Sequence, residues 1–435
     1  VDGTPATEVM FVDGTLQTSV PLPVFDQYTM DNNDGVNSYA DIRLQSPPVT
    51  FDDAVMDCAW MAGNDTFAAV DNNGVYEFIG ATMVLAGDMS IDGCSVVLEG
   101  SKLIFREESG NHPTLTIGNG GSLVMKEDSG TLDIPKIYGE GNLDAVEIVI
   151  ESGGLLDMQA GTMKNFVMPS GQTHQLEVVT GATFNMAGGA YLTASDLSTA
   201  GSGSVLLIDG GTVTVSSSAF IAGSGNYGSG VEIVNGGQMT GDGLTVSNMD
   251  TGIMNTDGTL TMDSYTSTAN TNGVKADSGT TTTLTNSQIS DAAVAVDILG
   301  GADVSMDGMD IDDSAIGVRT AGTNTVSMSG LDVDGTLGTT PTYGVFTTST
   351  SSGTITVSNS DFNGISTGIY LGSGLVTISD TAISNGVNGV QVSSQSSSNH
   401  VLDSVTLTGN DVSVKLDGTG TISMADVDIT SVTTD

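Results

Sequence analysis

An eight-residue phrase with apolar residues at its first, third, sixth and eighth positions recurs along the last two-thirds of this chain. Consecutive copies start 21 to 29 residues apart, and two of the starts, Thr282 and His400, are imperfect. A repeat of this length is typical of a solenoid, in which each repeat adds one turn to a continuous core. The copies start at Leu156, Phe184, Val213, Met239, Leu260, Thr282, Val304, Val326, Ile355, Val376, His400 and Ile422.

The spacing inside the phrase predicts short strands. Residues two apart lie on the same face of a strand, so Val304 and Met306 form one strand, and Met309 and Ile311 form another after a two-residue corner. After each phrase comes a further apolar residue, which we assign to a third strand. It often comes directly after Gly, which suits a corner because it accepts positive φ. We therefore expect three short strands in each coil and very little helix.

Equal positions of stacked coils should form columns inside the solenoid. The third phrase position gives one apolar column, in which Met is common; a flexible thioether fills irregular gaps in a narrow core. The eighth position gives a second column, which we predict to include Met163, Tyr191 and Phe220.

Two stretches, 357–371 and 378–392, carry the phrase and its third strand most regularly. They resemble the right-handed parallel β-helix repeat of the pectin-lyase-like family, and the resemblance covers roughly residues 150–435. It implies an all-β, right-handed parallel β-helix, and the usual chirality of parallel crossovers points to the same hand. The family includes lyases, hydrolases, adhesins and surface-layer proteins, and we place this chain in a non-enzymatic, secreted or surface branch.

The start of the chain does not follow the repeat. We predict a small β-rich cap or assembly domain over residues 1–80, irregular first coils over 81–155 and regular coils over 156–435. The two cysteines, Cys58 and Cys94, are expected to form a disulfide, as is common in secreted β-proteins. The alternative is a pair of buried thiols.

The formal charge is −43, from 52 acidic and 9 basic residues. Such a chain repels nucleic acid, so we exclude it as a partner. Self-repulsion of this size must be screened by salt or neutralised by bound cations. No apolar run is long enough to span a bilayer. Since the sequence starts at Val1, we expect that a signal peptide has been removed and that the protein is extracellular or at the cell surface.

Acidic residues are predicted to form a ladder on the outside of three successive coils. Like charges on neighbouring coils disfavour one another unless a cation lies between them, and oxygen ligands suit Ca²⁺. We interpret the ladder as a candidate Ca²⁺ site, with a solvated acidic face as the alternative. Its members are Asp310, Asp312, Asp332, Asp334, Asp361 and Asn363.

The sequence offers little for catalysis. Asp312 and Asp313 have the residue type that glycoside hydrolysis needs, but the Gly-His-Gly and Arg-x-Lys motifs usual in the hydrolases of this family do not occur. Arg319 is expected to form a surface ion pair. We therefore predict that the chain is not an enzyme. The three histidines are far apart in sequence: His112, His174 and His400.

The last phrase is not followed by a capping segment, and an open strand edge is a template for another chain. We expect head-to-tail assembly into a filament, sheath or surface layer. The alternatives are a polar cap, a monomeric adhesin or stalk that binds surface glycans, and a polysaccharide lyase or glycosidase. The residues predicted to meet are Val9, Met10, Phe11 and Val12 at one end, and Ile422, Met424, Val427 and Ile429 at the other.

Overall fold

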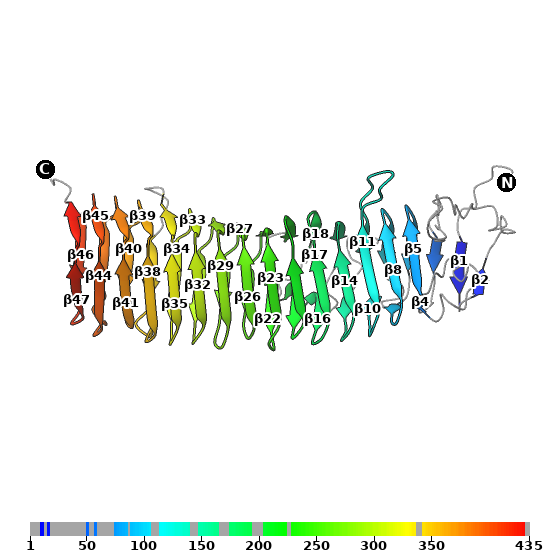
Figure 1. The fold of residues 1–435 in the computed structure, drawn as a ribbon, viewed down its shortest axis with the longest axis horizontal. Coiled ribbons are helices and arrows are strands. Elements are labelled where there is room, and N and C mark those ends of the chain that lie inside the picture. Colours follow the sequence, from blue (N-terminus) through cyan, green and yellow to red (C-terminus); the bar gives the residue numbers. More distant parts are fainter. Residues whose placement is uncertain are drawn as a thin grey trace. The chain divides into compact units, whose positions relative to one another are not determined.

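The computed structural model describes residues 9–12, 15–17, 49–51, 56–58, 74–85, 88–105, 113–139, 147–164, 174–193, 203–223, 228–335 and 342–430. The described residues form short strands joined by tight corners, and none of their elements is a helix (Figure 1). The chain divides into two compact units, Val1–Asn226 and Tyr227–Asp435. Each unit repeats the order sheet 1, sheet 2, sheet 3 along the chain, which confirms three strands in each coil.

In unit 1, each sheet is a parallel ladder of strands from successive coils. Sheet 1 holds β5 (Val75–Ile79), β8 (Ser95–Glu99), β11 (Ser122–Lys126), β14 (Leu155–Met158), β17 (Thr183–Met186) and β20 (Thr212–Val215). Sheet 2 holds β3 (Val49–Phe51), β6 (Thr82–Leu85), β9 (Lys102–Phe105), β12 (Lys136–Gly139), β15 (Gly161–Lys164), β18 (Ala190–Thr193) and β21 (Ala219–Ala222). Sheet 3 holds β4 (Met56–Asp57), β7 (Met89–Ile91), β10 (Thr114–Ile117), β13 (Glu147–Ile150), β16 (His174–Val179) and β19 (Ser204–Asp209).

Unit 2 repeats this arrangement. Sheet 1 holds β23 (Gln238–Asp242), β26 (Thr259–Asp263), β29 (Thr281–Thr285), β32 (Asp303–Asp307), β35 (Thr325–Ser329), β38 (Thr354–Ser358), β41 (Leu375–Ser379), β44 (Asn399–Asp403) and β47 (Thr421–Ala425). Sheet 2 holds β24 (Leu244–Ser247), β27 (Thr266–Thr268), β30 (Gln288–Ser290), β33 (Asp310–Asp312), β36 (Asp332–Asp334), β39 (Asp361–Asn363), β42 (Ala382–Ser384), β45 (Thr406–Thr408) and β48 (Asp428–Thr430). Sheet 3 holds β22 (Ser229–Val234), β25 (Thr251–Asn255), β28 (Asn272–Ala276), β31 (Val294–Leu299), β34 (Ile316–Ala321), β37 (Tyr343–Thr347), β40 (Thr367–Leu371), β43 (Asn388–Val392) and β46 (Val412–Leu416).

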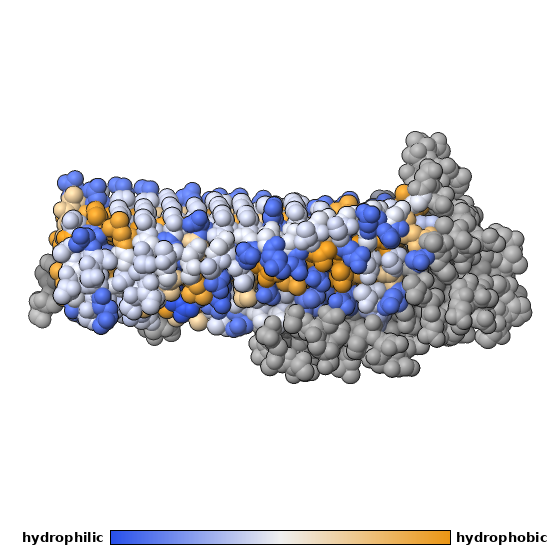
Figure 2. All heavy atoms as spheres, turned by 90° about the horizontal axis from the view of Figure 1, so that it is seen from below, coloured by the Kyte–Doolittle hydropathy of each residue, from blue (hydrophilic) through white to orange (hydrophobic). Residues whose placement is uncertain are grey.

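The predicted column at the third phrase position is confirmed within each unit. Met158 pairs with Met186 in unit 1, and Met306 pairs with Met328 in unit 2. All four side chains are buried. On the face shown in Figure 2, blue and pale residues predominate, with smaller orange groups between them. Apolar residues alternate inward along each strand, so the hydrophobic effect sets the register of the coils.

A left-handed residue makes the corner between sheets 1 and 2. In unit 2 the fifth phrase position always has positive φ, which Asn, Asp and Gly tolerate better than other residues. This single residue turns the chain and accounts for the step of three inside the phrase. The nine residues are Gly243, Ser264, Asn286, Gly308, Gly330, Asn359, Asp380, Ser404 and Asp426.

The second predicted column is wrong in two coils of unit 1. Met163 pairs with Leu192, and Leu192 pairs with Ile221, so Tyr191 and Phe220 lie on the outer face. These two coils have one more residue at the corner between sheets 1 and 2, and in one of them both Ser217 and Ser218 have positive φ. The extra residue shifts the following strand by one position, which exchanges its inner and outer faces.

The glycine predicted at the corner before the third strand is the second residue of that strand, and its role differs from the one predicted. Gly273 is not in the left-handed region, but a Cβ at this position would lie 2.6 Å from the carbonyl oxygen of Ala295. Gly252 and Gly389 meet backbone oxygens of the following coil in the same way. Glycine is needed here because the backbones of neighbouring coils approach closely.

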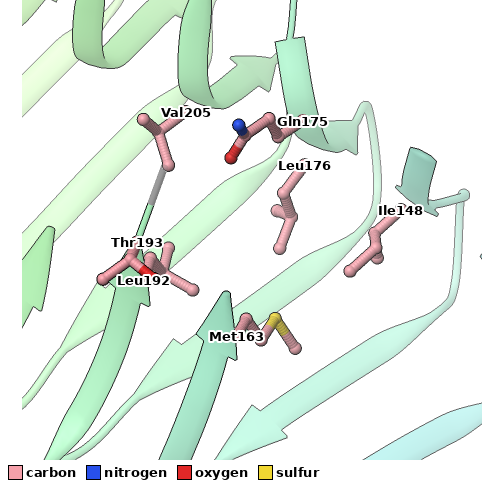
Figure 3. Close-up of a pocket in the computed structure, with 7 residues that line it drawn as sticks. All are labelled: Ile148, Met163, Gln175, Leu176, Leu192, Thr193 and Val205. Carbon is pink, nitrogen blue, oxygen red and sulfur yellow. The ribbon is translucent and has the colours of Figure 1, made fainter. Parts of the chain in front are cut away.

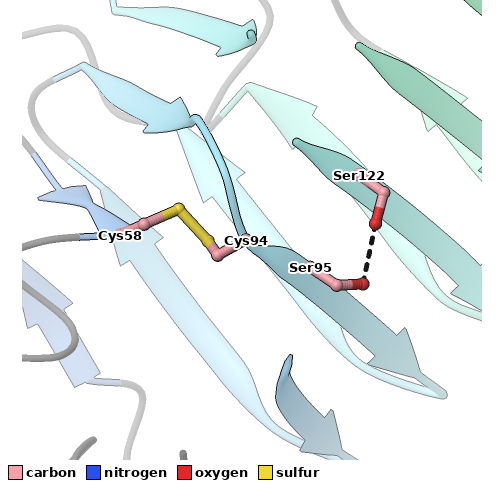
Figure 4. Close-up of a disulfide and its surroundings, with 4 residues drawn as sticks. All are labelled: Cys58, Cys94, Ser95 and Ser122. Atoms are coloured by element: carbon pink, nitrogen blue, oxygen red, sulfur yellow. Dashed lines mark hydrogen bonds between the residues drawn. A yellow bond between two sulfur atoms is a disulfide. The ribbon is translucent and has the colours of Figure 1, made fainter. Parts of the chain in front are cut away.

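A disulfide joins Cys58, which follows β4, to Cys94, which precedes β8 (Figure 4). The predicted pairing is confirmed.

β1 (Val9–Val12) pairs with β3 and, in antiparallel fashion, with β2 (Thr15–Gln17). The ladders of sheets 1 to 3 include β3, β4 and β5, which fall inside the range assigned to an N-terminal domain. The domain boundary at residue 80 and the right-handed sense stay predictions.

Unit 1 also contains a small apolar cavity (Figure 3). Its lining side chains come from β13, β15, β16, β18 and β19, and all but one of them are buried. A gap this small between mostly apolar core side chains is a packing defect. The lining residues are Ile148, Met163, Gln175, Leu176, Leu192, Thr193 and Val205.

Candidate functional site

The acidic ladder lies where the sequence predicted. Asp310 pairs with Asp332, and Asp332 pairs with Asp361, on the outer face of sheet 2. In the neighbouring outer row, Asp312 pairs with Asp334 and Asp334 with Asn363, whose amide nitrogen donates a 3.2 Å hydrogen bond to Asp334.

Two carboxyl groups of this ladder have a raised pKa. Partial desolvation, together with the charges of Asp312 and Asp334, raises the pKa of Asp310. Partial desolvation also raises the pKa of Asp332, and the nearby carboxylates of Asp334 and Asp361 add to the effect. Both shifts have the sign expected for carboxyl groups that are partly desolvated and lie close to like charges. The ladder does not form a group of three ligand atoms within 4.8 Å of one another, and Ca²⁺ binding here stays a prediction.

Among the described residues, one group of three side chains meets that distance criterion: Glu147, His174 and Glu177. Glu147 begins β13, and His174 and Glu177 lie on β16, the next strand of sheet 3. The sequence analysis missed this group because 27 residues separate Glu147 from His174, and the coils there have unequal lengths.

Sheet 3 of unit 2 carries an aromatic cluster on its outer face. Phe346 and Tyr370 occupy equal positions of neighbouring coils, and their ring centroids lie 5.0 Å apart in a stacked arrangement. Tyr343 lies 4.7 Å from Phe346 and 5.4 Å from Tyr370, also between ring centroids. All three side chains are half-buried. Their rings form one continuous apolar surface across two coils.

Polar groups continue the same row of sheet 3. Arg319 pairs with Phe346 on one side of the cluster, and Gln391 pairs with Tyr370 on the other. The Arg319 guanidinium forms a two-bond ion pair with Asp297, which confirms the predicted ion pair and raises the pKa of the arginine. The sequence could have predicted this row, because Arg319, Phe346 and Tyr370 each come directly after the apolar residue that marks the third strand of a coil.

The residues predicted to take part in assembly are partly described. Val9–Val12 form β1, whose side chains lie outside the described residues. Met424 and Ile429 pair with the inner residues Leu402 and Leu407, and they are 47% and 49% exposed. Ile422 and Val427 are half-buried. The contact between copies stays a prediction.

Comparison with known proteins gives no family assignment. No protein-family model matches the chain, and no curated protein sequence matches it. A solved structure, the endo-xylogalacturonan hydrolase from Aspergillus tubingensis, is similar over 87% of this chain and 93% of its own length, with 12% identity and a TM-score of 0.26.

This finding corrects one prediction. This solved structure is a hydrolase, so the expectation that the chain belongs to a non-enzymatic branch and is not an enzyme is withdrawn. The likeness is too weak to assign an activity. Among the described residues, no helix is long and apolar enough to cross a membrane.

Proposed function

We propose that this protein binds a carbohydrate polymer through the outer face of sheet 3 in unit 2, outside the cell. The cluster of Tyr343, Phe346 and Tyr370 carries the proposal. Aromatic rings offer large apolar faces at low cost in side-chain entropy, and the C–H faces of sugar rings pack against such surfaces. The extended face of a solenoid suits a polymer, because equivalent positions repeat at about 4.8 Å along the stack of coils.

The polar residues around the cluster support binding of a hydroxyl-rich ligand. Arg319 is 36% exposed, its backbone pairs with Phe346, and its side chain forms an ion pair with Asp297 on the preceding coil. Gln391 donates a 2.7 Å hydrogen bond to Asp417, which also pairs with Lys415. Side chains fixed in this way can hydrogen-bond a ligand without a large loss of entropy on binding. The disulfide and the acidic composition fit an extracellular location.

A second candidate function is glycoside hydrolysis at the acidic ladder. Hydrolysis requires two carboxyl groups, one of which acts as a general acid and has a raised pKa. Asp310 and Asp332 lie on neighbouring strands and both have a raised pKa, which favours this candidate. Release of reducing sugar from polysaccharides would establish it, provided that Asp332→Asn abolishes the activity.

Binding can be tested with a panel of immobilised polysaccharides. The full chain should bind at least one of them, and Phe346→Ala or Tyr370→Ala should weaken binding at least tenfold. Tyr191 and Phe220 in unit 1 provide the matched control, since they form another aromatic pair on an outer face, with centroids 6.0 Å apart. Phe220→Ala should leave binding unchanged. Equal losses in all three variants, or no binding to any polysaccharide, would contradict the proposal.

Head-to-tail assembly is a separate prediction with its own test. If the strand containing Val9–Val12 joins the coil containing Ile422 of another copy, deletion of residues 1–24 should leave only monomers in sedimentation velocity experiments. Unchanged assembly after the deletion would exclude this contact.

A further inference from the structure

We propose that Glu147, His174 and Glu177 form a binding site for a divalent transition-metal ion of the Zn²⁺ type. The Nε2 atom of His174 lies 3.2 Å from a carboxylate oxygen of Glu177 and 3.9 Å from one of Glu147. The three candidate ligand atoms all lie within 4.8 Å of one another. Zn²⁺ binds imidazole nitrogen and carboxylate oxygen at about 2.0–2.2 Å, so tetrahedral ligands lie about 3.3 Å apart. Small rotamer changes would bring all three atoms to that separation.

The fold holds these side chains on one surface. Ile148 pairs with Leu176, and both are buried, so Glu147 and Glu177 lie on the outer face of sheet 3. Gln175 and Leu176 are buried in succession, and this irregularity places His174 on the same outer face as Glu177. The side chains of His174, Glu147 and Glu177 are only 13%, 20% and 19% exposed. Ligands on adjacent strands of a rigid ladder are well suited to metal binding, because little order must be imposed when the ion binds.

A second carboxylate pair in unit 1 provides an informative comparison. Glu77 and Glu99 lie on neighbouring strands of sheet 1, and the ammonium group of Lys126 lies 2.7 Å and 2.8 Å from their oxygens. That pair therefore has a permanent positive charge between its members. Among the described residues, no lysine or arginine forms an ion pair with Glu147 or Glu177.

The group that lies between Glu147 and Glu177 is an imidazole, which is a cation only when it is protonated. In its neutral form imidazole is the commonest metal ligand among protein side chains. A site with one nitrogen ligand and two carboxylates, in a chain of net charge −43, attracts divalent ions strongly. The nitrogen ligand selects Zn²⁺ and its neighbours over Ca²⁺, which prefers a complete set of oxygen ligands.

Calorimetric titration of ZnCl₂ into the full, tag-free chain tests the site after dialysis against EDTA and then metal-free buffer. The titration should be done at about 0.15 M salt, where screening reduces general attraction to the acidic surface. We expect one Zn²⁺ ion to bind per chain with higher affinity than any other. Millimolar Ca²⁺ should not displace it. Glu177→Gln and His174→Ala should each weaken this binding at least tenfold.

Asp303→Asn is the matched control, because it removes one negative charge from the outer face of sheet 1 in unit 2, outside this group and outside the acidic ladder, just as Glu177→Gln removes one within the group. The control should bind Zn²⁺ as the unmodified chain does. Absorption of the Co²⁺-loaded protein should show a nitrogen-ligated site, and this spectrum should be lost in His174→Ala. Absence of a Zn²⁺ site, or an equal loss of affinity in Asp303→Asn, would overturn the proposal. Circular dichroism of each variant would separate unfolding from loss of a ligand.

Discussion

Arg319 and Asp297 face each other across neighbouring coils, with Nε 2.7 Å from Oδ1 and Nη2 2.5 Å from Oδ2. The Asp297 side chain is only 3% exposed. Its charge is tolerated because the arginine satisfies both carboxylate oxygens in a planar, two-bond arrangement. Arg319 lies on the strand between those of Asp297 and Phe346, so this ion pair stabilises sheet 3 and fixes a polar side chain on the strand next to the proposed carbohydrate surface.

Removal of the arginine should destabilise unit 2. In Arg319→Ala the Asp297 carboxylate is left buried without its partner, and the free energy of unfolding should fall by about 2 kcal/mol, since Arg319 itself is partly exposed. Urea unfolding followed by circular dichroism measures this change. Arg319→Lys should recover only part of the loss, because an ammonium group cannot form the two-bond contact. A double variant, Arg319→Met with Asp297→Leu, should be closer to the unmodified chain than Arg319→Ala is. No loss of stability in Arg319→Ala would contradict this account.

Neutralising Asp332 should stabilise the protein at neutral pH. The folded pKa of this carboxyl group is raised above its ordinary value of 3.8, so the folded state binds the proton more tightly than the unfolded state. Its contribution to stability is therefore most favourable at low pH and is lost as the pH rises through the raised pKa. Asp332→Asn should raise the thermal unfolding midpoint at pH 7 and make it less sensitive to salt.

The control for this prediction is Asp303→Asn. Asp303 pairs with Thr281 and Thr325, so it has no carboxylate at the equal positions of the neighbouring coils. The difference between the two variants should shrink as the pH is lowered toward 4. A midpoint at pH 7 that is the same for both variants would show that repulsion within the ladder is negligible.

Asn410 should stabilise the corner of the preceding coil. Its amide oxygen accepts a 2.9 Å hydrogen bond from the backbone N–H of Gly386, and its amide nitrogen donates a 2.8 Å bond to the carbonyl of Ile383. The side chain is buried, so Asn410→Ala leaves two buried backbone groups without partners and should cost about 1–3 kcal/mol. Asn388→Ala, at a half-exposed site, should cost less than half as much in the same urea titration. Equal costs would show that burial of these bonds is unimportant.

Reduction of the disulfide should loosen the first coils of unit 1. The bond between Cys58 and Cys94 joins residues 36 positions apart, and closure of such a loop stabilises the folded state by about 4 kcal/mol in the chain-entropy account. A reducing agent should speed proteolysis of this region and lower its unfolding midpoint. The double variant Cys58→Ser, Cys94→Ser should behave like the reduced chain and should not respond to the reducing agent. Identical proteolysis of the oxidised and reduced chains would refute the expected role.

The sequence was informative about the coil because each coil repeats a local pattern. Alternation of apolar residues determined the strands and the inner column through Met306 and Met328. The acidic ladder of Asp310, Asp332 and Asp361 followed from the same register. The prediction that Tyr191 faces inward was wrong, because one additional corner residue reverses the faces of the next strand. The pattern of apolar residues cannot show how the chain turns at that corner.

The sequence by itself determined the three-strand coil, the apolar column and the row of stacked carboxylates, since burial and strand periodicity act over a few residues. Only the tertiary structure decided which side chains meet across coils of unequal length. His174 meets Glu147, 27 residues earlier, and Tyr343 meets Tyr370 in the next coil, because hydrogen-bonded ladders align strands regardless of the length of the segments between them.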